Sequence, residues 1–234
     1  MDVSLLRYLV VSLPAFGLER CGYRANDPVV LVREHRGVLR VVLCSPAATR
    51  LGFRKGMSSA EARAQFAGGP QVLQEPEWED QDRAELVESF REISDRVCAY
   101  GTGGVALEIS TLRTHGGRED RVLVHTRSRA DTLGHACRLV IADHPKAAVA
   151  LAEWMDQDVI VPAGEGAAWL ADLPIEALHP SDALKEALRV IGLTQIGQLT
   201  QLDPASVSVR YGREGVGLWK VARGSGDPIS GRTW

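Results

Sequence analysis

The sequence predicts an α+β protein, in which a mixed α/β region is followed by a helical one. Residues 6–13 (LRYLVVSL) are continuously apolar and contain β-branched residues, the pattern of a strand covered on both faces. Strand and helix patterns then alternate up to about residue 161, which favours a single α/β or α+β lobe. A Pro- and Gly-containing segment at 162–166 indicates a linker, and almost no strand signal follows it.

Composition and charge limit the classes of function. The 234 residues are 45% hydrophobic, enough to bury a core divided among two or three small lobes. The formal net charge of -3 argues against a dominating basic field, so any DNA contact is expected to be local or weak. The sequence shows neither a membrane span nor a secretory signal, which makes a cytoplasmic location the default expectation.

The strands and helices of the first half are marked by turn and cap residues. Pro14 ends the first strand and can open a short helix. Residues 28–44 read as two strands around Gly37, a hairpin with its charged residues near the turn. A short helix over 46–51 is closed by Gly52, and residues 58–61 (SSAE) form a capping box that opens a second helix.

Later elements follow from apolar spacing. Apolar residues at intervals of three and four over 78–97 predict one long amphipathic helix, with its core positions at Leu86, Phe90, Ile93 and Val97. Strands are expected at 105–109 and 138–142, with a partly helical basic stretch between them. The remaining predicted helices cover 146–154, 182–190, 196–202 and 215–223.

A helix-hairpin-helix pattern occupies residues 191–199 (IGLTQIGQL). Its two glycines allow a tight turn, and exposed N–H groups at the start of the second helix suit a DNA phosphate. This pattern predicts sequence-independent DNA binding by Gly192, Leu193, Thr194, Ile196 and Gly197. The alternative reading is a glycine-containing turn between packed helices that binds no ligand.

The order of several motifs resembles the Y-family DNA polymerases along nearly the whole chain. Residues 12–17 (SLPAFG) stand where the family has Asp-x-Asp-x-Phe-(Tyr/Phe) after its first strand. Residues 45–57 are similar to the family's finger helix, and residues 103–108 (GGVALE) stand in place of its Asp-Glu-x-x-Leu-Asp strand. The finger hairpin resembles residues 28–32, and WLADLPI at 169–175 precedes the thumb motif.

The resemblance implies a right-hand core without a little finger. A palm-like domain would comprise residues 1–25 and 72–163, and a small fingers-like domain 26–71. A thumb-like helical domain with the helix-hairpin-helix would cover 164–230, ahead of a tail at 231–234. The chain stops after the thumb and shows no clamp-binding peptide, so it is expected either to be a fragment or to have lost those roles.

The departures from the family pattern concern catalysis. Active members hold two magnesium ions through carboxylates at positions that carry Ser12, Gly103 and Gly104 here. The resemblance therefore implies no catalytic residues, no metal site and no cofactor. Glu108 and Asp143 are other carboxylates to consider, but Glu108 matches a non-catalytic family Asp and Asp143 lies beside Lys146.

The nucleotide-binding positions are also changed. Pro46 and Thr49 replace the finger Tyr and Arg that contact triphosphate in the family, which removes a hydroxyl donor and a bidentate phosphate ligand. Gly17 stands at the position that excludes ribose. Only Lys146 matches a triphosphate-contacting residue of the family, and it is interpreted as a vestigial nucleotide contact.

This combination resembles the ImuB-like branch, the inactive Y-family members of a bacterial mutagenesis cassette. The resemblance implies a non-catalytic scaffold for DNA repair and damage-induced (SOS) translesion synthesis that binds primer-template or damaged DNA weakly. Its implied partners are the sliding clamp, an error-prone replicative-type polymerase and a RecA-like ImuA protein. Two alternatives remain: a stand-alone helix-hairpin-helix DNA-binding module and a residually active error-prone polymerase.

Overall fold

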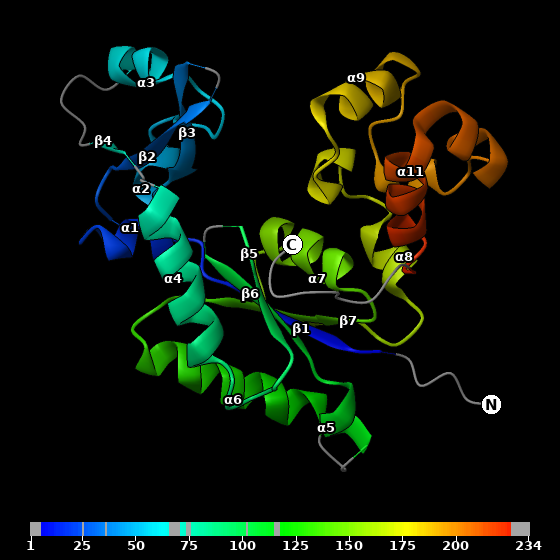
Figure 1. The fold of residues 1–234 in the computed structure, drawn as a ribbon, viewed down its shortest axis with the longest axis horizontal. Coiled ribbons are helices and arrows are strands. Elements are labelled where there is room, and N and C mark those ends of the chain that lie inside the picture. Colours follow the sequence, from blue (N-terminus) through cyan, green and yellow to red (C-terminus); the bar gives the residue numbers. More distant parts are fainter. Residues whose placement is uncertain are drawn as a thin grey trace.

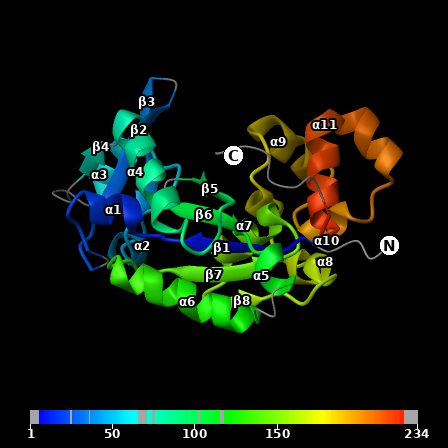
Figure 2. The same cartoon turned by 60° about the horizontal axis from the view of Figure 1, so that its bottom comes forward.

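A five-stranded sheet forms the centre of the molecule, with a smaller sheet at one end and a group of helices at the other (Figures 1 and 2). The computed structural model describes residues 6–24, 26–35, 37–65, 71–73, 76–101, 103–114 and 118–225. The large sheet has the order β5-β6-β1-β7-β8, and only β7 and β8 run parallel. Its strands are β1 (Tyr8–Ser12), β5 (Val97–Tyr100), β6 (Gly104–Glu108), β7 (Arg138–Ala142) and β8 (Val159–Ile160).

The central strand β1 is buried on both faces, as its unbroken apolar sequence predicts. Leu9 and Val11 face a core that includes residues of α4 (Pro76–Ser89) and α6 (Glu119–Thr132). Val10 faces the opposite core, which includes the buried residues 147–152 of α7 (Pro145–Trp154). Because side chains alternate along a strand, Ser12 lies on the α7 face of the sheet. A further short helix, α5 (Ser110–Thr114), follows β6.

The small sheet has the order β3-β2-β4 and carries three short helices. β2 and β3 form the predicted antiparallel hairpin, with Gly37 at a φ of 77° in its turn. β4 pairs with β2 in parallel, so residues 72 and 73 lie in the small sheet, beyond the expected boundary of the fingers-like segment at 71. The elements are α1 (Phe16–Arg20), β2 (Val30–His35), β3 (Val38–Cys44), α2 (Pro46–Arg50), α3 (Ser59–Gln65) and β4 (Gln71–Leu73).

The C-terminal helices pack against α7, whose seven buried residues are apolar and mostly alanine. A helix that is apolar all round must be covered on several sides, and here the sheet covers one side and the C-terminal region another. Small side chains allow both neighbours to approach closely. The region contains α8 (Gly166–Leu170), the 3-10 turn η1 (Ile175–Leu178), α9 (Asp182–Val190), α10 (Ile196–Leu199) and α11 (Pro204–Ala222).

Three predicted helices differ from the structure, and one of them, expected over 196–202, ends at Leu199. The helix expected over 78–97 ends at Ser89, and Val97 instead begins β5. Phe90 and Ile93 lie in the turn after the helix, yet they are buried in the same core as Leu86 of α4. This shared burial explains why their spacing in the sequence resembles that of a helix. The last helix begins at Pro204, eleven residues earlier than expected, because Asp203 caps it and a kink at Gly212 joins two helical segments.

Other local predictions are confirmed. β7 and α9 have the predicted bounds, and the Ser58 and Glu61 side chains exchange capping-box hydrogen bonds with each other's backbone N–H groups. Within the described ranges, no helix combines the length and the apolar character needed to cross a membrane.

Candidate functional site

A cavity of about 320 Å³ lies where the end of the large sheet meets the small sheet. It opens on the α7 face, because Ser12, Tyr100 and Gly104 all lie on that face of their strands. The lining residues are Ser12, Leu13, Pro14, Val42, Leu43, Cys44, Thr49, Phe53, Arg54, Lys55, Tyr100, Gly101, Gly103, Gly104, Arg138 and Glu153. Strand β3 and the segment after α2 supply the apolar wall.

The three positions singled out by the sequence converge in this cavity. Ser12 pairs with Gly104 across β1 and β6, and the N–H of Leu13 donates to the carbonyl of Gly103 at 2.7 Å. The structure therefore brings Ser12 next to Gly103 and Gly104, which follow it by about ninety residues in the sequence.

No side chain fits at either glycine without movement of its surroundings. A Cβ on Gly104 would lie 2.3 Å from the ring of Tyr100, and one on Gly103 would lie 2.6 Å from the carbonyl oxygen of Leu13. The tyrosine ring fills the space over Gly104, its partner across β5 and β6. Burial raises the pKa of Tyr100 above its ordinary value, and the neighbouring Ser12 offsets part of that effect.

These residues do not fit a pair of magnesium ions like the one that active Y-family members hold. Mg²⁺ is held mainly by carboxylate oxygens, whereas Ser12 offers one hydroxyl and the glycines offer no side-chain donor. Among the described residues that line the cavity, Glu153 is the only carboxylate, and it pairs with Nε2 of His179 at 2.8 Å. The described part of the chain contains no group of three or more His, Cys, Asp and Glu side chains placed to hold a metal ion.

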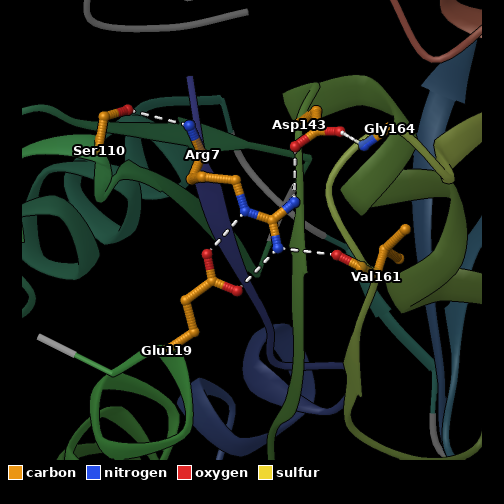
Figure 3. A network of polar contacts seen from close by, with 6 residues as sticks. All are labelled: Arg7, Ser110, Glu119, Asp143, Val161 and Gly164. Carbon is orange, nitrogen blue, oxygen red and sulfur yellow. Dashed lines mark hydrogen bonds and ion pairs between the residues drawn. The ribbon is translucent and has the colours of Figure 1, made fainter. Parts of the chain in front are cut away.

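The other two candidate carboxylates are held by arginines away from the cavity. Glu108 pairs with Arg96 at 2.8 Å. Asp143 accepts a hydrogen bond from Arg7 at 2.6 Å and another from the N–H of Gly164 (Figure 3). These contacts use the carboxylates in structural ion pairs.

Arg7 is buried at the end of β1 opposite the cavity and joins four segments (Figure 3). Its guanidinium also donates twice to Glu119, at 2.8 Å each, and once to the carbonyl of Val161. Burial lowers the pKa of Arg7, but the hydrogen bonds with Glu119 and Asp143 outweigh burial and leave the pKa raised. These contacts connect β1 to the start of α6 and to the segments after β7 and β8 at this end of the sheet.

Three cations line the cavity that the sequence reasoning did not identify. Arg54 and Lys55 come from the loop after α2, and Arg138 comes from the first position of β7. The Arg-Lys pair before Gly56 was visible in the sequence. Only the pairing of Arg138 with Ser12 reveals that a residue of the large sheet lines the same cavity.

Lys146 does not lie with these cations. Ser12 pairs with Arg138 and Tyr8 pairs with Ala142, so β7 runs away from the cavity toward the Arg7 end of the sheet. Lys146 follows Ala142 by four residues, is exposed on the first turn of α7 and is absent from the lining. The structure thus places Lys146 outside the lining of this cavity, and its role as a vestigial nucleotide contact stays a prediction.

The segment with the helix-hairpin-helix pattern connects α9 to α10, but its N–H groups are not free. Ile196 donates to the carbonyl of Leu173, and Gly197 donates to that of Ala171, both at 2.9 Å. Thr194 and Gln195 both donate to the side chain of Gln198.

The remaining donors of this turn are also used. The N–H groups of Gly192 and Leu193 close the end of α9 through Arg189 and Leu188. The expectation of exposed N–H groups is therefore wrong, because the α8–η1 segment and the turn itself satisfy them. A Cβ on Gly197 would lie 3.0 Å from the carbonyl of Ala171, so this glycine permits close packing on α8.

Sequence comparison finds relatives over about half of the chain. Two proteins from strains of Caulobacter vibrioides, each named Protein ImuB, are 36% identical over 119 residues. This match covers 51% of the chain and about a quarter (26%) of the length of those relatives. No protein-family model matches the chain.

Solved structures match the fold over nearly the whole chain. DinB from Sulfolobus solfataricus has a TM-score of 0.74 at 13% identity, covering 97% of this chain and 70% of that one. An insertion ternary complex of Dbh DNA polymerase has a TM-score of 0.75 at 14% identity, with the same coverage. A Y-family DNA polymerase chimera scores 0.73 at 13% identity, covering 96% of this chain and 69% of that one. The chain is ImuB-like in sequence and has a Y-family polymerase-like fold.

Proposed function

We propose that this ImuB-like chain, with its Y-family polymerase-like fold, is a non-catalytic component of DNA-damage tolerance. It would act as a scaffold in induced translesion synthesis and bind primer-template or damaged DNA weakly and without sequence preference. Its proposed protein partners are a sliding clamp, an error-prone replicative-type polymerase and a RecA-like ImuA protein.

One observation carries the non-catalytic assignment. Ser12, Gly103 and Gly104 converge in the cavity between the two sheets, and the Tyr100 ring fills the space over Gly104. Two-metal phosphoryl transfer needs carboxylates that bridge the ions at this kind of site. Glu153 is the one carboxylate that the described lining residues supply, and it already pairs with His179.

Primer extension tests this proposal directly. The purified chain would be incubated with primed template, four deoxynucleotides and either Mg²⁺ or Mn²⁺, beside an active Y-family polymerase as the positive control. We expect no extension. Extension that is lost on Glu153→Gln, with the protein still folded, would show that the cavity holds metal through a new ligand and would overturn the non-catalytic assignment.

DNA contact by the C-terminal helices is proposed to use side chains, since the turn's N–H groups are occupied. On α9, Lys185 and Arg189 each pair with a carboxylate of their own helix. On α11, Arg210 and Arg213 are exposed and form no ion pair within the described part of the chain. Unpaired cations on either side of the α11 kink are the better candidates to meet phosphates.

A pair of matched double variants separates these surfaces. We expect Arg210→Ala with Arg213→Ala to weaken binding to a primed duplex several-fold and to reduce its salt dependence. Lys185→Ala with Arg189→Ala removes the same charge and is expected to have a smaller effect. Fluorescence anisotropy at several salt concentrations measures both, and equal losses would assign the effect to net charge instead of to α11.

A further inference from the structure

Glu153 has two basic side chains as neighbours, and they belong to different parts of the molecule. It is the last residue but one of α7, and its side chain lines the cavity with 32% of its surface exposed. Nε2 of His179, the residue that ends η1, pairs with it at 2.8 Å. Arg138, the first residue of β7, lines the same cavity.

Arg138 lies close to Glu153 and has no strong partner of its own. Its Nη1 makes a long contact of 3.5 Å with the carbonyl of Ala152, which precedes Glu153 in α7. Burial is the main cause of the raised pKa of Tyr100, but the charge of Glu153 adds to the rise and that of Arg138 opposes it. Both charges therefore lie near the same hydroxyl group.

His179 is held in an unusual backbone conformation. Its φ of 52° places it in the left-handed region, and no other described residue except glycine has a positive φ. A residue with a Cβ adopts this region only at an energetic cost. Strain of this kind persists where the surroundings impose it, and it is a reason to look for a conformational role.

The segment 179–181 connects η1 to α9. Three of the four residues of η1 are buried in the core that they share with α7. At the start of α9, the N–H and the hydroxyl of Ser181 donate to Glu214 of α11, at 2.6 and 2.8 Å. The contact between His179 and Glu153 therefore lies where the chain passes from α7 toward α9 and α11.

We propose that Glu153 alternates between His179 and Arg138, and that this choice links the conformation of the 179–181 segment to the charge of the cavity. When Glu153 contacts His179, the segment is fixed against α7 and Arg138 stays unpaired. When Glu153 turns to Arg138, the two charges neutralise each other at the cavity and the segment is released. One carboxylate serves both contacts, so strengthening one weakens the other.

The chemistry of the two contacts suits such a competition. Partly exposed ion pairs are individually weak, so neither partner excludes the other. Nε2 of a histidine can donate to a carboxylate in either charge state of the ring, and a guanidinium always carries its charge. The inference requires only these three side chains, so it is independent of the scaffold role and of catalysis.

Amide hydrogen exchange at the 179–181 segment tests the competition. The reporter is the N–H of His179, which donates to the carbonyl of Glu176 at 3.0 Å and exchanges when this turn opens. We expect Arg138→Gln to slow amide exchange there about two- to fivefold, the effect of one partly exposed ion pair on an equilibrium constant. The reason is that Glu153 loses its other partner. A purely structural role of Arg138 predicts faster exchange, because a lost contact loosens its surroundings.

Matched variants identify the carboxylate and the cation. Glu153→Gln should speed amide exchange at His179, and adding Arg138→Gln to that variant should have no further effect. Arg138→Lys keeps the positive charge and should leave the rate close to that of the wild type. Lys55→Gln removes a positive charge from the small sheet's side of the cavity and should not change the rate. Amides of β1 report global unfolding in each variant and show whether it is folded.

Three results would overturn the proposal. One is an unchanged or faster rate at His179 in Arg138→Gln, and another is an effect of Arg138→Gln that persists in the Glu153→Gln background. The third is equal slowing by Lys55→Gln, which would assign the effect to net charge. Primer extension and DNA binding do not enter this test, so the competition for Glu153 can fail while the scaffold role stands.

Discussion

At the scale of single residues, Tyr100 and Gly104 leave no room for a side chain at position 104. They face one another across β5 and β6, and a Cβ on Gly104 would lie 2.3 Å from the tyrosine ring. Close-packed interiors do not absorb such an overlap without shifting side chains or backbone. Reinstating carboxylates at 103 and 104 alone is therefore expected to destabilise the chain instead of rebuilding a metal site.

Gly104→Ala should lower the free energy of unfolding by about 1–3 kcal/mol, the usual range for overpacking. In a Tyr100→Ala background, the same substitution should cost much less, because the ring that it would strike is gone. Urea denaturation of the wild type, both single variants and the double variant gives the coupling energy. Additive effects would show that the ring does not set the requirement for glycine.

At the scale of elements, Arg7 holds the end of the large sheet opposite the cavity. It connects β1 to Glu119 at the start of α6 and to Asp143 after β7, with only 1% of its side chain exposed. Removing one partner of a buried ion network leaves the other charges without compensation. The stability lost on removing Arg7 is therefore greater than the net stability that the ion pairs contribute.

Arg7→Met should lower the free energy of unfolding by about 3–5 kcal/mol, measured by chemical denaturation. Adding Glu119→Gln and Asp143→Asn should recover part of that loss, because no unpaired carboxylate remains. Arg118→Ala removes an arginine near the same end of the sheet whose side chain is 70% exposed and pairs with Asp120. It should change stability little. Similar losses for Arg7→Met and Arg118→Ala would contradict the importance of burial.

The kink in α11 depends on one glycine. Gly212 has a φ of 59° and a ψ of -152°, in a region that essentially only glycine occupies. Gly217 lies in the same helix, has no positive φ, and a Cβ there would meet nothing within 4 Å. The backbone conformation at Gly212 therefore requires glycine, whereas that at Gly217 does not, although both lie in α11.

Gly212→Ala should destabilise the chain by about 1–3 kcal/mol, the cost of holding alanine in that conformation. Gly217→Ala should stabilise it by about 0.5–1 kcal/mol, because alanine loses less backbone freedom in a helix interior. Thermal midpoints of the two variants, compared with the wild type, test both signs. A higher midpoint for Gly212→Ala would mean that α11 straightens without loss.

At the scale of the whole molecule, one hydrophobic core passes from the large sheet through α7 into the C-terminal helices. It includes Val10 and Val140 of the sheet, Leu151 of α7, and Leu170 and Leu218 beyond the linker. The small sheet has its own two clusters, one around Val30 and Phe53 and the other around Leu18 and Leu31. Because they share one core, the large sheet and the C-terminal helices are coupled to each other more tightly than either is to the small sheet.

The large sheet and the C-terminal helices should therefore unfold in one cooperative transition. Calorimetry would give a calorimetric enthalpy equal to the van't Hoff enthalpy for that transition. Amide exchange should show lower protection in β2 and β3 than in β1 and β7, since smaller cores open at lower free energy. Separate transitions for the sheet and the C-terminal helices would show that the shared core does not couple them.

Local chemistry explains which predictions from the sequence are confirmed. The apolar run of β1, the glycine turn of the β2–β3 hairpin and the capping box at Ser58 depend on neighbours within a few residues. The wrong prediction of a helix where β5 lies also comes from a local pattern. Helical spacing of Phe90, Ile93 and Val97 is compatible with a helix, and the pairing of β5 with β6 decides otherwise.

The sequence by itself determined the α+β class, most of the helices and strands, and the resemblance that led to Ser12, Gly103 and Gly104. Only the tertiary structure placed the Tyr100 ring over Gly104, brought Arg138 opposite Arg54, separated Lys146 from the cavity and occupied the N–H groups of the hairpin turn. These features depend on strand register and on contacts between residues far apart in the chain. Spacing within one segment carries no information about such contacts.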